Sequence, residues 1–168
     1  MSKTYSGLYA GTIGSRPCKG SERDLQVKVT DWAQVEADKL EKISRKKRRD
    51  FNTATVVYDE STGNYYYGRN GGIDIYKEPH NPVLYGDATH PRLLPKTSPY
   101  YYGVDNCAEI HAVNRALNSG AKLKNLRLYT IHAISASKVS FGDKKMSCQN
   151  CAFTLKGRIK ENYTGWEV

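Results

Sequence analysis

The sequence predicts a single α/β domain, and three patterns along the chain favour that fold class. Apolar residues recur at helical spacing over Asp31–Arg49, a stretch without glycine or proline. Two β-branched and aromatic runs, separated by a polar turn, then predict a β-hairpin. Two further helical patterns flank one apolar strand in the second half of the chain. A chain of 168 residues can bury one sizeable hydrophobic core around such elements.

The N-terminal stretch is rich in glycine, serine and charged residues. We predict that residues 1–30 form a lead-in or linker, with a short strand at Asp24–Val29, and that the domain proper spans 31–168. The beginning of this stretch, MSKTYSGLYA, contains no continuous apolar segment, so we expect no signal peptide.

The helix predicted over Asp31–Arg49 ends in an unbroken basic run, Arg45–Arg49. Thr30 or Asp31 can cap the start of this helix. Positive charge at a helix C-terminus stabilises the helix dipole, so the basic run is interpretable as a solvated helix end. It is equally interpretable as a phosphate-binding patch, and the sequence leaves both interpretations open.

The predicted hairpin consists of a strand over Thr53–Tyr58, a turn over Asp59–Asn64 and a return strand over Tyr65–Gly68. Residues 70–105 are punctuated by prolines and glycines and predict a connection of about 35 residues with little regular structure. A loop of that length in a compact domain is usually functional or mobile.

The next elements are a helix over Cys107–Ser119 and a buried strand over Leu126–Ile134. Asn106 is a suitable N-cap for this helix, and Gly120 is a suitable stop. Within the helix, one apolar stripe is formed by Ile110, Val113 and Leu117.

A polar loop over residues 135–147 separates that strand from the last predicted helix. This helix begins at Cys148, with Ser147 as its cap, and runs to about Arg158. The remaining segment leaves room for one short strand over Tyr163–Val168.

The most informative pattern is Cys107-Ala108-Glu109, followed later by Cys148-Gln149-Asn150-Cys151. Three thiolates can occupy three positions of a tetrahedral zinc ion and leave the fourth to water, as in catalytic zinc sites. A glutamate close to the first ligand can move that water's proton, as in the zinc deaminase signature. The sequence therefore predicts zinc as the cofactor, with Cys107, Cys148 and Cys151 as ligands and Glu109 as the general acid/base.

Both cysteine motifs open predicted helices, where the positive end of the helix dipole favours thiolate. The reaction that this site can perform is attack of water on an amidine-like carbon, C4 of cytosine or C6 of adenine. Glu109 would pass protons to the ring nitrogen and to the leaving ammonia. The competing interpretation of Glu109 is a solvated helix carboxylate.

The four cysteines also allow two disulfides in place of a metal site. Cys18 lies far upstream, in SRPCKGSE, and we interpret it as a free thiol. If Cys18 were instead a fourth zinc ligand, the site would be closed and structural.

The order of helix, hairpin, helix with Cys-Ala-Glu, strand and helix with C-x-x-C resembles the cytidine deaminase-like superfamily. Asn106–Ala116 (NCAEIHAVNRA) and Ser147–Ala152 (SCQNCA) are most similar to the YwqJ-like deaminases, toxin domains of bacterial polymorphic toxin systems. The resemblance covers about residues 31–160. It implies a three-layer α/β/α sandwich around a mixed sheet of four or five strands.

The resemblance also implies the zinc and proton-shuttle roles given above for Cys107, Cys148, Cys151 and Glu109. An asparagine at the end of the second strand often contacts the substrate sugar in this superfamily, and Asn70 matches that place, although it also suits an ordinary turn. Ser147 stands where the family usually has proline, and we include it among the substrate-binding residues. A second departure is the short C-terminal segment, which has room for one of the family's two last strands.

Aromatic and basic residues bear on the substrate. The net charge is +9, from 26 Lys+Arg against 17 Asp+Glu, which suits an anionic partner such as nucleic acid and suits a merely soluble basic surface equally well. Tyr100, Tyr101 and Tyr102 precede the Cys-Ala-Glu helix, so we expect them at the pocket mouth, where aromatic rings can stack on single-stranded bases. Tyr65–Tyr67 are interpreted as a strand with alternating faces, and His111, His132 and Trp32 as packing residues.

The resemblance thus implies a cytosine deaminase acting on nucleic acid, DNA before RNA and single strands before duplex. It further implies a secreted bacterial toxin, active in the target-cell cytoplasm, with a cognate acidic immunity protein that the basic charge would attract. We expect a monomer without a membrane segment, since no apolar run reaches about 18 residues. Two alternatives stay open: an enzyme for RNA or free nucleosides and nucleotides, and a non-catalytic zinc module that binds nucleic acid.

Overall fold

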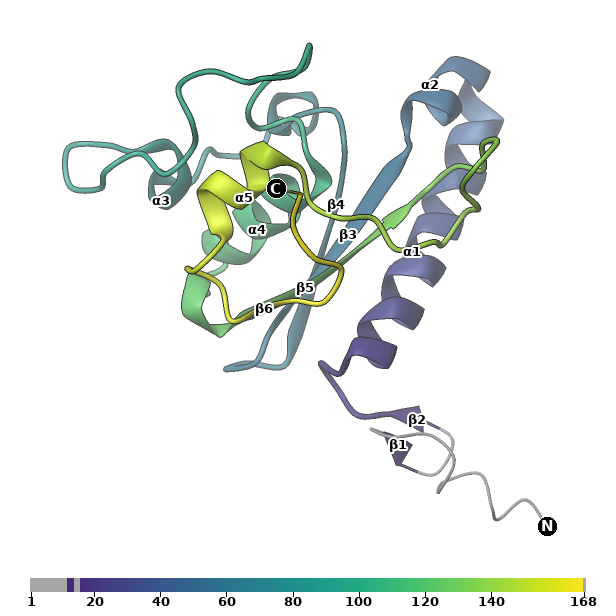
Figure 1. Ribbon diagram of the computed structural model, residues 1–168, viewed down its shortest axis with the longest axis horizontal. Coiled ribbons are helices and arrows are strands. Elements are labelled where there is room, and N and C mark those ends of the chain that lie inside the picture. Colours follow the sequence, from purple (N-terminus) through teal and green to yellow (C-terminus); the bar gives the residue numbers. More distant parts are fainter. Residues whose placement is uncertain (1–11, 14–15, 168) are drawn as a thin grey trace.

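The computed structural model describes residues 12–13 and 16–167 and has the architecture of an α/β sandwich (Figure 1). Its sheet has four strands in the order β4-β3-β5-β6. The central strand β3 runs antiparallel to β4 and β5, whereas β5 and β6 are parallel. The elements are β1 (Thr12–Ile13), β2 (Arg16–Pro17), α1 (Glu22–Ile43), α2 (Arg45–Asp50), β3 (Thr53–Asp59), β4 (Asn64–Arg69), η2 (Ile73–Tyr76), α3 (Pro82–Tyr85), α4 (Ala108–Asn118), η3 (Leu123–Asn125), β5 (Leu126–His132), α5 (Gln149–Leu155) and β6 (Glu161–Asn162).

Helices cover both faces of this sheet, with α1 on one side and α4 and α5 on the other (Figure 1). Because successive side chains of a strand point to opposite faces, each central strand contributes to both cores. Ala54 and Val56 of β3 pack with α1, whereas Val57 packs with α4. The predicted α/β class and mixed sheet are confirmed, with four strands in the main sheet.

The first helix starts earlier than the sequence predicts. α1 begins at Glu22, and the side chain of Ser21 caps it by accepting the Asp24 N–H at 3.2 Å. The strand predicted at Asp24–Val29 is therefore wrong, and residues 22–30 belong to the helix rather than to a lead-in. Apolar residues at alternate positions suit a short strand, but the buried stripe continues at helical spacing through Leu25, Val29, Ala33, Ala37 and Leu40. Residues 1–11 and 14–15 of the predicted lead-in lie outside the described residues.

The predicted helix over Asp31–Arg49 is interrupted at Ser44, which is extended with φ −166° and ψ 129°. The Ser44 hydroxyl oxygen accepts the Lys47 N–H at 3.4 Å and so starts the separate helix α2. The basic run therefore forms a short exposed helix that turns away from α1, next to the end of the sheet (Figure 1).

The hairpin is confirmed, since β3 and β4 pair in register over its whole length. The two later helices are confirmed with shifted bounds. Cys107 and Cys148 themselves are the N-cap residues, rather than Asn106 and Ser147, and α5 ends at Leu155 rather than near Arg158. The strand predicted over Tyr163–Val168 is wrong in position, because the paired residues are those of β6 and an isolated bridge joins Ser147 to Trp166. Val168 lies outside the described residues. No helix in the described part of the chain is long and apolar enough to span a membrane.

One glycine fixes how closely α4 approaches the sheet. A Cβ added to Gly68 of β4 would lie 2.4 Å from the Ala108 carbonyl oxygen and 2.5 Å from the Ala112 nitrogen. These are backbone atoms, so the helix would have to move. We expect Gly68→Ala to lower the free energy of unfolding by about 3 kcal/mol, measured by urea denaturation. Gly103→Ala, whose Cβ would meet only a side-chain oxygen at 3.4 Å, is the control and should cost about 1 kcal/mol or less; equal losses would contradict the packing argument.

Candidate metal centre and its cavity

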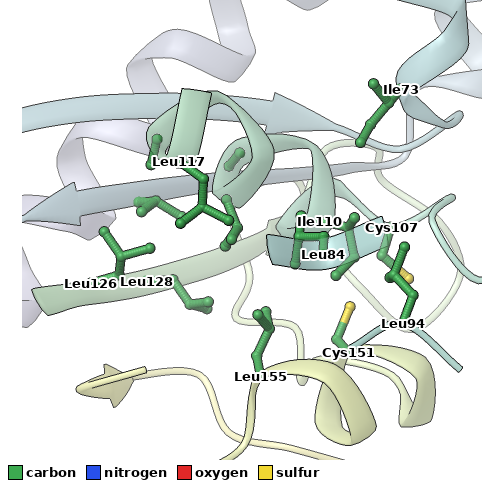
Figure 2. Packing of buried hydrophobic residues seen from close by; sticks show 14 of the residues in the cluster. Ile73, Leu84, Leu94, Cys107, Ile110, Leu117, Leu126, Leu128, Cys151 and Leu155 are labelled. Carbon is green, nitrogen blue, oxygen red and sulfur yellow. The ribbon is translucent and has the colours of Figure 1, made fainter. Parts of the chain in front are cut away.

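Three cysteines meet between the N-termini of α4 and α5. The Sγ atoms of Cys107, Cys148 and Cys151 all lie within 4.8 Å of one another, and all three residues are buried. Cys107 and Cys151 stand at the edge of the hydrophobic cluster, where their sulfurs point into the space between the two helices (Figure 2). This group could hold a metal ion such as zinc.

The spacing of the sulfurs follows from the local sequence. In C-x-x-C the second cysteine lies one helical turn after the first, so both side chains share one face. The Sγ–Sγ distance is 3.9 Å for Cys148–Cys151 and 2.9 Å for Cys107–Cys148. Tetrahedral bonds of about 2.3 Å separate two sulfurs by about 3.8 Å, so the first distance already suits zinc. The Cys107–Cys148 distance is shorter than the separation expected around zinc, and these two sulfurs are hydrogen-bonded to each other.

Hydrogen bonding and burial shift the pKa values of the three thiols in opposite directions. Hydrogen bonding with Cys107 and Cys151 lowers the pKa of Cys148 to about 2. The hydrogen bond with Cys148 raises the pKa of Cys107, and burial raises that of Cys151. A divalent cation that binds these sulfurs would displace thiol protons.

Glu109 lies beside the cysteines without belonging to their ligand group. Its side chain is buried, and its Oε2 accepts a hydrogen bond from the Thr130 hydroxyl at 3.2 Å. Because the Thr130 proton is used there, Thr55 must donate the 2.8 Å hydrogen bond that joins the two threonines. Burial raises the pKa of Glu109, and a hydrogen bond with Ser147 and the charge of Lys145 partly offset that rise. The carboxyl is therefore held in place from the sheet and from the start of α5.

A cavity of about 530 Å³ reaches this group from the surface. Its walls include Cys107, Glu109 and Cys148, together with Asn70, Tyr101 and Tyr102. Such a volume lies within the range of about 300–1,000 Å³ that small-molecule sites occupy. A substrate of nucleobase size could therefore reach both the sulfurs and the carboxyl.

The predicted substrate residues take different positions. Tyr101 is fully exposed at the rim, and Tyr102 lines the cavity with a hydrogen bond to Cys148. Tyr100 stacks on Tyr102 at 4.8 Å and is not among the residues that form the described walls. Its hydroxyl donates to Glu167 at 3.1 Å and accepts the Gln149 N–H at 3.0 Å.

Asn70 lies at the cavity wall, with its amide already engaged. Its Oδ1 accepts the N–H groups of Asn52 and Thr53 at 3.0 and 3.1 Å, and its Nδ2 donates to the Asp50 carbonyl at 2.8 Å. Ser147 is buried behind the site, where its hydroxyl contacts Glu109 and accepts from Asn162 Nδ2 at 3.0 Å. Both residues thus hold the site together.

The histidines divide between the core and the cavity. His111 packs as predicted: it is buried, stacks on Tyr76 at 4.2 Å and accepts the Arg69 N–H at 3.2 Å. The prediction that His132 is a core residue is wrong, because this last residue of β5 is half-buried and lines the cavity. Trp32 packs against the α1-side core and stacks on Tyr67 at 5.2 Å, as predicted.

Cys18 does not belong to the group of neighbouring cysteines found in the described residues, and it is a free thiol. The site therefore has three protein sulfurs and no fourth cysteine within the part of the chain that the structure describes. If these three sulfurs held a tetrahedral zinc ion, one coordination position would remain for water, as in catalytic zinc sites.

The sequence did not identify several residues that lie in or next to the cavity. Lys145 comes from the polar loop before α5, donates its N–H to the Thr130 carbonyl at 3.0 Å and directs its Nζ to the Thr53 hydroxyl. No motif marks this lysine. Thr130 could have been placed from the strand alone, since it shares a face with Leu126 and Leu128. Arg49, from the basic run interpreted as a possible phosphate-binding patch, also lines the cavity, together with residues that no sequence pattern identifies: Asp50, Asn52, Thr53 and Glu167.

Comparison of the chain with protein-family models, with curated proteins and with solved structures finds no match in any of the three. The two motifs and the geometry of the site that they form are therefore the features that indicate a function.

Proposed function

We propose that this chain is a zinc-dependent cytosine deaminase of the cytidine deaminase-like superfamily and that it acts on nucleic acid. The observation that carries the proposal is a buried carboxyl, Glu109, beside three thiols at the floor of an open cavity. A structural zinc site has no need of an adjacent carboxyl that is not a ligand, nor of an opening to solvent.

Each residue of the site has a distinct role in this proposal. Cys107, Cys148 and Cys151 would hold zinc, which supplies a Lewis acid that makes a bound water more acidic. Thr130 and Ser147 orient the Glu109 carboxyl. Glu109 takes a proton from the attacking water, passes it to N3 of cytosine, and carries the second proton to the departing amino group. Cytosine and water become uracil and ammonia, and Glu109 returns to its starting state.

Three features favour a polymer over a free nucleoside. Arg49 and Lys145 line the same cavity as Glu109, beside Asp50 and Glu167, so two cations are placed where an anionic substrate could contact them. Tyr101 presents an exposed ring at the rim, which suits stacking on an unpaired base. The net charge of +9 favours association with a polyanion. Single-stranded DNA is the preferred substrate in this proposal, because its bases are not paired with a partner strand and need less energy to enter the cavity.

We further propose that the enzyme is a secreted bacterial toxin that acts in the cytoplasm of a target cell, as the family resemblance implies. A cognate immunity protein with an acidic surface would complement the basic charge and accelerate binding. We propose that the chain acts as a monomer.

The test is a deamination assay with one sequence offered as single-stranded DNA, duplex DNA, RNA and free cytidine, with uracil and inosine measured by mass spectrometry. We expect uracil in single-stranded DNA first, with one zinc per chain in the purified protein. Cys18→Ser is the control and should match the unmodified chain in both readouts. No uracil or inosine in any substrate, together with zinc lost in Cys18→Ser, would leave a structural zinc module instead.

A further inference from the structure

A small cavity lies at the β4 edge of the sheet. Its walls are Trp32, Glu36, Arg69, Tyr76, His111 and Arg115. These residues come from both α1 and α4, which cover opposite faces of the sheet, so the cavity lies beside the edge strand. It shares no wall residue with the cavity that contains Glu109. Its volume is about 160 Å³, the space of about five water molecules, which suits a small ion rather than a nucleotide.

His111 contributes a buried donor that lacks an acceptor. The residue is 1 % exposed, and its Nδ1 accepts the Arg69 N–H at 3.2 Å. Burial and the charge of Arg115 lower the pKa of His111 to about 4, so the ring is neutral at pH 7 and carries its proton on Nε2. Among the described residues this Nε2 has no hydrogen-bond partner, since the Glu78 Oε2 stays 3.7 Å away. A ligand that supplied an acceptor would remove the cost of that unsatisfied N–H.

Arg69 contributes a guanidinium that its neighbours hold in one orientation. Its Nε donates to the Tyr76 hydroxyl, and its central carbon lies 5.1 Å from the Tyr76 ring and 5.6 Å from the Phe51 ring. Its Nη1 lies 4.0 Å from Oε1 of Glu36, another wall residue, which is beyond hydrogen-bond distance. Burial lowers the pKa of Arg69, and the charge of Glu36 offsets that effect only in part. The Nη1 group is therefore preorganised on the cavity side without a full counter-charge.

The two carboxylates near this cavity already have cations of their own. Arg115 holds Glu78 through Nε and Nη2, with a closest distance of 2.7 Å. Lys39 lies 3.6 Å from Glu36, closer than Arg69 does. Pairing the charges in this way leaves Arg69 as the surplus cation. The cavity thus combines one positive charge with a neutral imidazole N–H, and an oxyanion can accept hydrogen bonds from both groups.

We propose that this cavity binds a small oxyanion, a phosphate or a carboxylate, at a site separate from the catalytic cavity. The anion accepts hydrogen bonds from Nε2 of His111 and from Nη1 of Arg69. The proposal does not depend on the proposed function. His111 lies two residues after Glu109 on α4, and Arg69 ends β4. A bound anion would therefore join the helix that carries Glu109 to the edge strand of the sheet.

The first test is calorimetric titration of the purified chain with inorganic phosphate and, separately, with acetate. The anion that binds more tightly identifies the oxyanion, and binding of neither would overturn the proposal. We expect Arg69→Met, which keeps the length of the side chain without its charge, to weaken binding roughly tenfold. Arg49→Met is the matched control, because Arg49 lines the catalytic cavity instead, and its affinity should stay unchanged. An equal loss in both variants, or a loss in the control alone, would place the anion elsewhere and refute the site.

Two substitutions of the histidine separate its two nitrogens. His111→Asn places an oxygen near the Nδ1 position and can keep the bond to the Arg69 N–H, but it lacks the second donor. His111→Gln places an amide N–H near the Nε2 position. We expect His111→Asn to weaken binding roughly tenfold and His111→Gln to retain more of the affinity; the opposite order would contradict the proposed contact. Nitrogen NMR of the imidazole in the unmodified chain needs no variant, and an Nε2 signal of His111 that the bound anion leaves unshifted would overturn the proposal.

Discussion

Replacement of Glu109 by glutamine is expected to lower kcat for cytosine deamination about a thousandfold while the protein keeps its zinc. Glutamine has nearly the same shape, so it can still accept the hydrogen bond from Thr130 and fill the buried space beneath the cavity. Its amide cannot take a proton from water or return one to the base. The measurement is uracil formation under single-turnover conditions, with zinc content and melting temperature determined on the same sample.

The matched control is Glu167→Gln, which changes the other glutamate that lines the cavity. Glu167 accepts a hydrogen bond from Tyr100, so its role is to support the aromatic wall. We expect its loss to lower kcat by less than about tenfold. A Glu109→Gln enzyme that retains a similar share of activity would show that the proton moves through another group, and a loss of zinc would show that Glu109 is a ligand.

Removal of zinc is expected to lower the melting temperature by roughly 8–16 °C. At free zinc a thousandfold above Kd, binding adds about 4.1 kcal/mol to stability, and each kcal/mol is worth about 2–4 °C in a chain of this size. The three sulfurs lie within 4.8 Å of one another, so a single ion can bind all of them. Differential scanning fluorimetry before and after exhaustive chelation measures the change, and added zinc should reverse it.

Serine substitutions identify which thiols bind the metal. Cys107→Ser, Cys148→Ser and Cys151→Ser should each reduce zinc to well below one ion per chain and remove the chelator effect. Cys18→Ser should behave as the unmodified chain, because Cys18 is not part of the cluster. A melting temperature that chelation leaves unchanged would contradict metal binding at this centre.

The sequence predicted those elements whose pattern is local. The β3–β4 hairpin and the helix α4 carry period-two and helical patterns with clear stop signals, and the structure confirms them. The start of α1 was missed because Leu25 and Val29 fit two periodicities over a short window, and only packing against the sheet selects the helix. The break at Ser44 was also missed because the local sequence is ambiguous: nothing in the basic run itself disfavours a continuous helix.

The site residues also separate into those that a local motif identifies and those that only the tertiary structure places. The cysteines and Glu109 could be proposed as site residues because they occur in short motifs, and the clustering of the three cysteines is confirmed. Lys145 and His132 could not be placed, because their position depends on the register of β5 and on the path of an irregular loop. Ser147 was expected to face the substrate, but pairing with the C-terminal segment buries it behind Glu109.

That pairing connects the C-terminal segment to the buried carboxyl. The Ser147 N–H donates to the Gly165 carbonyl at 2.9 Å, and the Glu167 N–H donates to the Ser147 carbonyl at 2.8 Å. Both backbone groups of the residue that precedes the second cysteine motif are therefore bonded to residues 165–167. A change in the backbone of that segment would be transmitted to Ser147 and, through its hydroxyl, to the Glu109 carboxyl.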